Sequence, residues 1–149
     1  QLSRRITGQL WYFFVSMIVG VGLDLCLVSR MEKAITRSGG RFAARVFTSD
    51  ERRYCESRAQ PAQHFAARFA AKEAILKALG VPEGLSWHEL EIAQRPSGGP
   101  QVVLHGVARQ AALALGISVL HLSLTHQGDA ACAVVIAERW AEASERSLE

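Results

Sequence analysis

The segment FAARFAAKEAILKALG, residues 65–80, predicts one long helix. Alanine is the strongest helix former, and the larger apolar side chains recur at spacings typical of a helix with a buried face. Gly80 is the kind of residue that commonly ends a helix. Lys72, Glu73 and Lys77 stand out among these small and apolar residues, because burying a carboxylate is costly unless a cation meets it. The helix therefore raises the question of which cation Glu73 meets.

The composition is that of an ordinary globular domain. The chain has 149 residues, of which 49% are hydrophobic and 21% are charged, so one domain is the simplest expectation. A net charge of +3 suits an acidic partner or a phosphorylated ligand without requiring either. Three cysteines without metal-like spacing argue against a disulfide framework or structural zinc and favour a reducing compartment. We therefore expect a cytoplasmic protein.

The start of the sequence is apolar, but it does not predict a membrane segment. The run LWYFFVSMIVGVGLDLCL, residues 10–27, contains Ser16, two glycines and Asp24, and falls short of a clean stretch of about 20 apolar residues. It also lacks a small-residue cleavage site before a polar mature start. We expect three parts in the chain: an N-terminal extension over residues 1–16, a domain over residues 17–140 that begins at Met17, and a polar C-terminal tail over residues 141–149.

Residues 17–25 alternate as in a β-strand. One face is apolar throughout and consists of Met17, Val19, Val21, Leu23 and Leu25. The other face carries Gly20 and Gly22 and then the carboxylate of Asp24. Glycine weakens a strand unless something must approach the backbone closely. Two alternatives explain the glycines: a ligand trough that ends at Asp24, or a helix packed tightly over the strand.

The remaining pattern mixes helices and hairpins. Thr48 and Glu51 form a capping-box signature, and Pro61 suits the first turn of the long helix. We expect helices over about 28–37, 49–57, 61–79 and 106–115, and strands within 87–94, 101–105, 118–126 and 130–137. The residues from Glu138 onward are polar and predict a frayed or helical tail. Because βα units do not alternate, the sequence predicts an α+β fold.

Asp24 and Glu73 are the candidate metal ligands. Two carboxylates from separate elements, without a histidine or cysteine cluster, suit Mg²⁺ better than zinc, because Mg²⁺ takes few protein carboxylates and completes its shell with water and phosphate oxygens. Phe69, Glu73 and Lys77 are spaced by four and share one helix face, so Lys77 would hold phosphate. The alternative is an ordinary exposed Glu73–Lys77 ion pair, which would contribute only on the order of tenths of a kcal/mol.

His126 follows a predicted strand and either binds phosphate, serves in proton transfer, or merely closes a hairpin. A basic stripe also runs along the helix at 28–37 and beyond it: Arg30, Lys33, Arg37, Arg41 and Arg45. Met31 and Ile35 supply apolar positions in the same helix. The stripe is either a solvated face or a dock for an acidic helical partner, in which charges speed encounter and apolar residues fix the fit. A nucleic-acid interface is disfavoured, because the stripe is short and lacks interleaved aromatic residues.

Six segments resemble the bacterial holo-[acyl-carrier-protein] synthases, the short single-domain group of 4′-phosphopantetheinyl transferases, in both order and separation. They are GVGLDLCLVSRM, RFAARVFTSDE, FAARFAAKEAILKALG, SWHELEI, GGPQVVLHG and SLTHQGDAACAVVIAERW. The likeness runs from Met17 to about Trp140. The helix with its KEAxxK pattern and the upstream GxD strand are specific in combination, whereas either one alone would be weak.

The resemblance implies an enzyme that moves the 4′-phosphopantetheine arm of coenzyme A onto a serine of apo-acyl carrier protein and releases adenosine 3′,5′-bisphosphate. It implies that Asp24 and Glu73 bind Mg²⁺, and that Lys77, Lys72 and His126 lie near coenzyme A. It implies a homotrimer with active sites between subunits, and a carrier-protein surface made of Arg30, Lys33, Arg37 and Arg41. The group that accepts the serine proton stays open. Without the resemblance, the alternative is a non-catalytic basic module that binds an acidic protein or a phosphorylated ligand.

Overall fold

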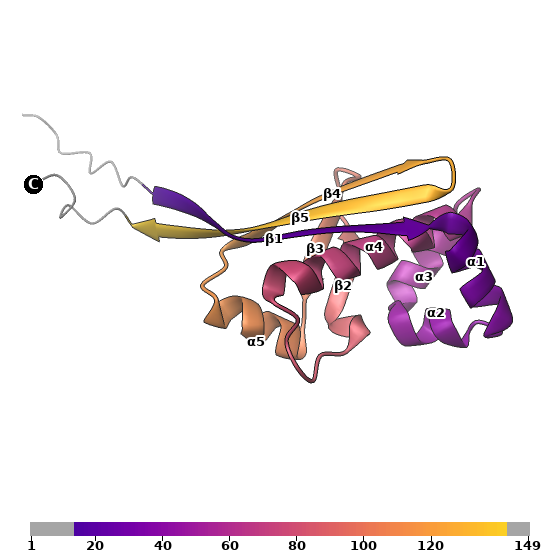
Figure 1. The fold of residues 1–149 in the computed structure, drawn as a ribbon, viewed down its shortest axis with the longest axis horizontal. Coiled ribbons are helices and arrows are strands. Elements are labelled where there is room, and N and C mark those ends of the chain that lie inside the picture. The colour runs from indigo at the N-terminus through magenta and orange to yellow at the C-terminus, as the bar shows by residue number, and fades with distance from the viewer. Residues whose placement is uncertain (1–13, 143–149) are drawn as a thin grey trace, which may run out of the picture.

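The computed structural model describes residues 14–142 and has the predicted α+β architecture (Figure 1). The elements follow the order β1 (Phe14–Leu27), α1 (Val28–Arg37), α2 (Arg41–Val46), α3 (Ser49–Glu56), α4 (Pro61–Leu79), the 3₁₀ turn η1 (Trp87–Glu89), β2 (Leu90–Gln94), β3 (Pro100–Leu104), α5 (Gly106–Ala114), β4 (Val119–Gln127) and β5 (Ala130–Glu142). The strands form an antiparallel three-stranded sheet of order β1-β5-β4 and a separate β2-β3 hairpin.

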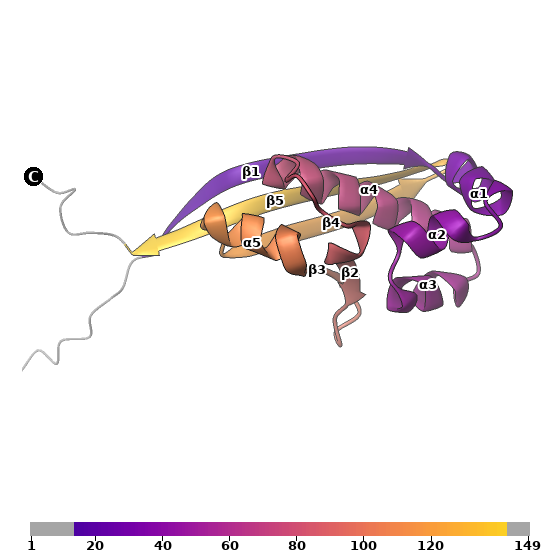
Figure 2. The same ribbon diagram turned by 90° about the horizontal axis from the view of Figure 1, so that it is seen from below.

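The long helix α4 lies across one face of the three-stranded sheet, and the other helices gather on the same side (Figures 1 and 2). Among the described elements, none covers the opposite face. This bare face carries the apolar side of β1, where Val21, Leu23 and Leu25 are each 58% to 59% exposed. A contiguous apolar patch of this kind on a sheet commonly marks an interaction surface. In the described part of the chain, no helix is both long enough and apolar enough to cross a membrane.

The glycines of β1 let the backbone of α4 approach the strand. A Cβ atom at Gly22 would lie 1.7 Å from the carbonyl oxygen of Ala74, and one at Gly20 would lie 2.3 Å from that of Ala78. Both distances are far below any real contact, so only glycine fits at either position. Of the two alternatives that the sequence left open, the tightly packed helix is therefore correct at these positions.

A buried ion pair joins α3 to α4 and to the hairpin. The Glu51 carboxylate accepts from the backbone N–H of Thr48 at 2.8 Å, which completes the predicted capping box. Its other oxygen accepts from the N–H of Ile92 in β2 at 2.9 Å. Lys72 Nζ lies 2.9 Å from the same carboxylate, and both side chains are almost completely buried. Such a pair tolerates burial only when hydrogen bonds satisfy all of its polar atoms.

The predicted helices at 28–37, 49–57 and 61–79 are confirmed to within one residue at their ends. The helix α2 was missed, because it is only six residues long and its N-cap, Gly40, has no side chain with which to signal a start. The predicted frayed or helical tail after Glu138 is wrong: β5 continues to Glu142, where it pairs with Phe14. The strands thus extend beyond the predicted domain limits 17–140 at both ends, while residues 1–13 and 143–149 of the two predicted flanking parts lie outside the described residues.

We expect Gly22→Ala to lower the free energy of unfolding by roughly 1–3 kcal/mol or more, because the added methyl group would force α4 away from β1. Urea denaturation followed by circular dichroism would measure the change. Gly99→Ala is the matched control, since a Cβ there meets no atom within 4 Å. Equal losses in the two variants would contradict the packing described for α4 and β1.

Candidate active site

Asp24, Glu73 and Lys77 come together where β1 passes over α4. Asp24 points to the helix-covered side of the strand, two residues beyond Gly22, and Glu73 and Lys77 lie one turn apart on the helix. Lys77 Nζ donates to Asp24 Oδ1 at 2.9 Å and to the carbonyl oxygen of Leu23 at 2.7 Å. Two carboxylates and one ammonium group, from elements far apart in sequence, are therefore held in one place by the backbone packing.

The two carboxylates line a cavity of about 590 Å³. Arg30 from α1 also lines it, and the rest of its wall comes from Leu25, Cys26, Leu27, Met31, Ala34, Phe42 and Phe69. A cavity at the end of a strand, with a few charged groups converging on apolar walls, is the usual form of a small-molecule site. This cavity is the candidate active site.

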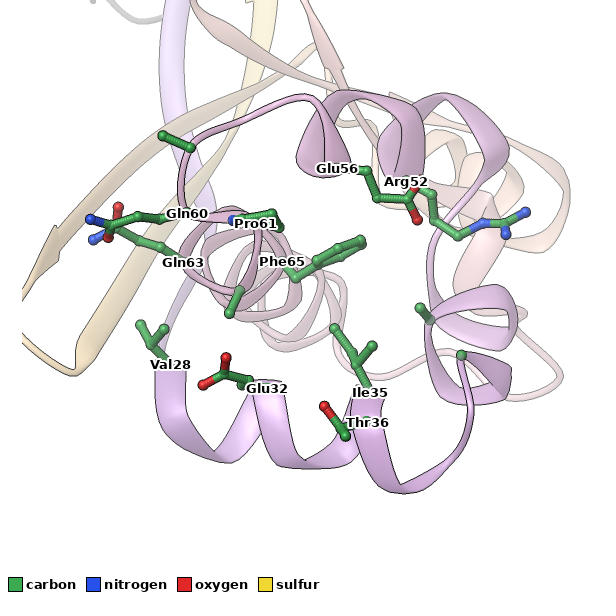
Figure 3. A pocket seen from close by; sticks show the side chains of 14 residues that line it. Val28, Glu32, Ile35, Thr36, Arg52, Glu56, Gln60, Pro61, Gln63 and Phe65 are labelled. Atoms are coloured by element: carbon green, nitrogen blue, oxygen red, sulfur yellow. The ribbon is translucent and has the colours of Figure 1, made fainter.

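A second cavity, of about 640 Å³, lies between α1, α2, α3 and the start of α4 (Figure 3). Val28, Ile35 and Phe65 form its apolar part, and Glu32 and Glu56 stand at its edge (Figure 3). It is slightly larger than the cavity beside Asp24, but it contains none of the residues that the sequence analysis singled out for phosphate or metal chemistry. The converging charges, rather than the volume, decide which of the two is the candidate site.

Glu73 is held in a setting that disfavours its charge. Burial, and then the neighbouring carboxylate of Asp24, raise the pKa of Glu73, and Lys77 opposes this only in part. The ion pair that Lys77 forms is with Asp24, so the predicted alternative of an ordinary Glu73–Lys77 pair is wrong. Among the described residues, the Glu73 carboxylate accepts no hydrogen bond. A cation bound between the two carboxylates would remove their repulsion.

The donor set suits a hard cation with few protein ligands. Within residues 14–142, no group of three or more histidine, cysteine, aspartate or glutamate side chains gathers in a metal-like cluster. Asp24 and Glu73 supply two carboxylates in an open cavity, which leaves room for water and for ligand oxygens. This is the arrangement that Mg²⁺ accepts and that zinc does not favour.

Lys72 does not take part in this site, contrary to the expectation that it lies near the coenzyme. Its side chain is completely buried, and besides the ion pair with Glu51 it donates to the carbonyl oxygens of Trp87 at 3.0 Å and Leu90 at 2.6 Å. These three contacts use all three ammonium protons. Lys72 therefore joins α4 to the hairpin, where no ligand phosphate can reach it.

His126 lies in a different cavity, of about 350 Å³, at the β4 edge of the sheet, whereas Asp24 lies at the β1 edge. It belongs to β4, and β5 separates that strand from β1. Arg68 and His64 line the same cavity. Burial, and then the charge of Arg68, lower the pKa of His64. A cavity with a buried guanidinium and two imidazole groups has the character of an anion site.

Arg68 is the residue that the sequence analysis missed. Its side chain is 3% exposed, its guanidinium lies 3.9 Å from the ring centroid of Tyr54, and its Nε is buried without a hydrogen-bond partner among the described residues. A buried donor of a charged group without a protein partner is satisfied by a water, an ion or a ligand. The signal was available, because Arg68 interrupts the alanine-rich helix in the same way as Glu73 does.

The predicted basic stripe is exposed at every position: Arg30, Lys33, Arg37, Arg41 and Arg45. Arg30 both belongs to the stripe and lines the candidate active site, so the two features adjoin. One of the two alternatives for the stripe, a partner dock, gave Met31 an apolar position in it; this part of that alternative is wrong, because Met31 is 3% exposed and packs in the core. The charged side chains remain available to an acidic partner.

Comparison with known proteins identifies the family. Residues 20–135 match the model of the 4′-phosphopantetheinyl transferase superfamily. The holo-[acyl-carrier-protein] synthase of Anaeromyxobacter dehalogenans is 48% identical over 125 residues, which cover 82% of this chain and 97% of that protein. The protein of the same name from Koribacter versatilis is 46% identical over 124 residues, covering 82% of this chain and 99% of the relative.

Solved structures agree with this assignment. The holo-ACP synthase of Plasmodium yoelii matches with a TM-score of 0.73 at 30% identity, over 84% of this chain and 98% of that one. The holo-[acyl-carrier-protein] synthase of Helicobacter pylori, solved in complex with coenzyme A, matches with a TM-score of 0.68 at 29% identity, over 78% of this chain and 98% of the other. The chain therefore belongs to the 4′-phosphopantetheinyl transferase superfamily, and within it to the holo-[acyl-carrier-protein] synthases.

Proposed function

We propose that this protein transfers the 4′-phosphopantetheine arm of coenzyme A to a serine of an apo-acyl carrier protein and releases adenosine 3′,5′-bisphosphate. The observation that carries the proposal is the meeting of Asp24 and Glu73 in one cavity of a chain from this family, with Lys77 hydrogen-bonded to Asp24. Relatives at 46% to 48% identity are named for this activity, and a neighbouring structure was solved with coenzyme A.

The reaction needs charge neutralisation more than covalent help from the protein. The serine oxygen forms a bond to the phosphorus that carries the pantetheine arm, and the bond from that phosphorus to the bridging diphosphate oxygen breaks. Negative charge then spreads over the phosphoryl oxygens and the leaving phosphate, where preorganised cations are worth most. Lys77 supplies such a cation, and its two hydrogen bonds to β1 hold its ammonium group in place.

Asp24 and Glu73 would hold a Mg²⁺ ion. When bound, the ion supplies a Lewis acid that neutralises diphosphate oxygens. Two features of the chain support this assignment: the like-charged carboxylates lie in one cavity, and the pKa of Glu73 is raised by burial and by Asp24. The ionised form of Glu73 is unfavourable without a cation, and a bound cation would stabilise it. We therefore expect the activity to depend on a metal ion.

A homotrimer would complete the site from a neighbouring subunit. Within one chain, His126 and Arg68 lie in a cavity separate from Asp24 and Glu73, on the far side of β5. Coenzyme A carries a diphosphate and, further along, a 3′-phosphate, so one molecule needs cationic groups at two places. Burial of the bare apolar face of β1 between copies would supply the driving force for assembly. We place His126 and Arg68 in the phosphate-binding part contributed by the neighbour.

The exposed stripe of Arg30, Lys33, Arg37 and Arg41 would receive the acidic carrier protein. Long basic side chains on the surface attract such a partner and orient it. Because Arg30 also lines the cavity, a carrier bound at the stripe would present its serine next to the phosphoryl group. Met31 takes no part in this surface, because it is buried.

Mass spectrometry of the carrier protein tests the proposed activity. With coenzyme A and Mg²⁺, apo-carrier should gain the mass of one phosphopantetheine arm, and a chelator should abolish the gain until Mg²⁺ is restored. Asp24→Ala and Glu73→Ala should each lower kcat/KM roughly 10²-fold or more, because each removes an electrostatic element of the site. Glu83→Ala, an exposed acid outside the cavity, should have no effect. An unmodified carrier at high enzyme concentration would overturn the proposal.

Glu73→Gln should make the metal-free protein more stable at neutral pH while lowering activity. The folded-state pKa of Glu73 lies above the ordinary carboxyl value of 4.5, so ionisation costs the folded state free energy at high pH. That cost falls away as the pH drops below 4.5, where the carboxyl is protonated in both states. Thermal unfolding with a chelator, followed from neutral to acidic pH, measures it. A glutamine variant less stable than the wild type at neutral pH would contradict this account.

Leu23→Asp should break the proposed assembly. Leu23 is 58% exposed on the bare face, and an aspartate there would have to be buried between copies. We expect sedimentation velocity to give about three times the mass of one chain for the wild type and a single-chain mass for the variant. Leu113→Asp is the control, because Leu113 is similarly exposed but lies on α5. A monomeric wild-type protein would refute the trimer without touching the family assignment.

A further inference from the structure

The helix that begins the basic stripe has no cap of its own. α1 starts directly after β1, and the residue at its N-cap position is Leu27, whose apolar side chain accepts no hydrogen bond. The first turn of the helix contains no acidic residue either. Because the first backbone N–H groups of a helix have no partner within the helix, the start of α1 depends on acceptors from elsewhere in the chain.

Asp129, in the turn between β4 and β5, supplies these acceptors. Its carboxylate accepts from the backbone N–H of Ser29 at 2.7 Å and from the Ser29 hydroxyl at 2.6 Å. Its carbonyl oxygen accepts from the backbone N–H of Val28 at 2.8 Å. A residue 100 positions further along the chain therefore caps α1.

The sheet fixes the place of Asp129. The pairing of Gln127 with Ala130 leaves a tight turn between β4 and β5. The first residue of this turn, Gly128, has a φ of +56°, in the left-handed region that glycine favours. Ala130 also pairs with Leu27, the last residue of β1. The turn therefore lies beside the start of α1, as both ribbon views show (Figures 1 and 2).

The cap matters because α1 buries little of its own surface. All ten residues of α1 are described, and Met31 is the one among them that is buried. Arg30 directly follows the capped Ser29, and it lines the cavity that contains Asp24 and Glu73. If the first turn frayed, Arg30 would lose its fixed position beside the cavity, and the rest of the stripe would lose its fixed orientation.

We propose that Asp129 is a positioning residue for the transfer reaction: by capping α1 from the β4–β5 turn, it holds Arg30 and the basic stripe in the orientation that receives the carrier protein. The inference rests on the proposed function, because it presupposes that a carrier binds at the stripe. Asp129 does not line the cavity, so it acts through α1 rather than on the reacting atoms.

The ionisation of Asp129 agrees with this role. The hydrogen bond from the Ser29 hydroxyl, and then the one from the Ser29 backbone N–H, lower the pKa of the Asp129 carboxyl below its ordinary value. Asp129 is therefore a carboxylate at neutral pH. Negative charge at the N-terminus of a helix is favourable, because the helix dipole places partial positive charge there.

Steady-state kinetics on the whole chain test the role. Asp129→Ala should raise KM for the apo-carrier roughly fivefold, the factor that corresponds to a lost helix cap, and leave KM for coenzyme A unchanged. Asp129→Asn should return KM for the carrier to within about twofold of the wild type, because asparagine caps a helix as well as aspartate does. Asp50→Ala is the matched control, since Asp50 is an exposed aspartate in the first turn of α3 that pairs with Arg53 on the surface.

Ser29→Ala gives a second measurement from the other side of the contact. It should raise KM for the carrier less than Asp129→Ala does, because the backbone N–H of Ser29 still donates to Asp129. Added to Asp129→Ala, it should cause no further rise, since the two variants remove the same interaction. Full additivity of the two changes would contradict the proposed contact.

Hydrogen exchange of the free protein, followed by mass spectrometry, gives a readout that does not depend on activity. Peptides from the start of α1 should exchange roughly fivefold faster in Asp129→Ala and at the wild-type rate in Asp129→Asn, while peptides from α4 stay unchanged. Unchanged exchange at α1, a wild-type KM for the carrier in Asp129→Ala, or an asparagine variant as poor as the alanine variant would overturn the inference. Absence of transfer by the wild-type protein would instead overturn the proposed function.

Discussion

The close contact between the backbone of α4 and the glycines of β1 is the constraint on which the rest of the molecule depends. The carbonyl oxygens of Ala74 and Ala78 occupy the places that side chains at Gly22 and Gly20 would fill. Because the helix lies so near the strand, Asp24 meets Lys77 at 2.9 Å and shares a cavity with Glu73. A wider spacing would separate the carboxylates, and the candidate site would be lost even if every other element kept its place.

The charged side chains of α4 point in different directions around the helix axis, and each meets different surroundings. Lys72 and Lys77 are five residues apart, so their side chains point about 140° away from each other. Lys72 faces the hairpin and pairs with Glu51 in the core, whereas Lys77 faces β1 and stays half exposed. Arg68 turns toward a third environment beside Tyr54. One short stretch of sequence thus supplies a structural ion pair, a candidate catalytic cation and a buried guanidinium that lines a second cavity.

The three-stranded sheet separates two cavities and leaves one of its faces bare. Each chain holds its carboxylates near the β1 edge and its cavity with His126 and Arg68 near the β4 edge, and the apolar side of β1 is open to solvent. The proposed assembly would bury these apolar side chains. It would also bring the carboxylates of one chain close to the His126 cavity of another. In that assembly, the leucines and valines that are exposed in the single chain would be buried between copies.

The sequence by itself determined most of the elements, without α2 and the end of β5, and the candidate residues other than Arg68. Local signals were sufficient for the capping box at Thr48 and for the limits of α1 and α4, since these depend on neighbours within one helical turn. Resemblance added the chemistry of the site. Only the tertiary structure decided which lysine is structural and whether the β1 glycines face a ligand or a helix. It also decided that Met31 is buried and that His126 lies apart from Asp24. These outcomes depend on contacts between residues distant along the chain, and no local pattern encodes the rotation of a helix against the sheet that it covers.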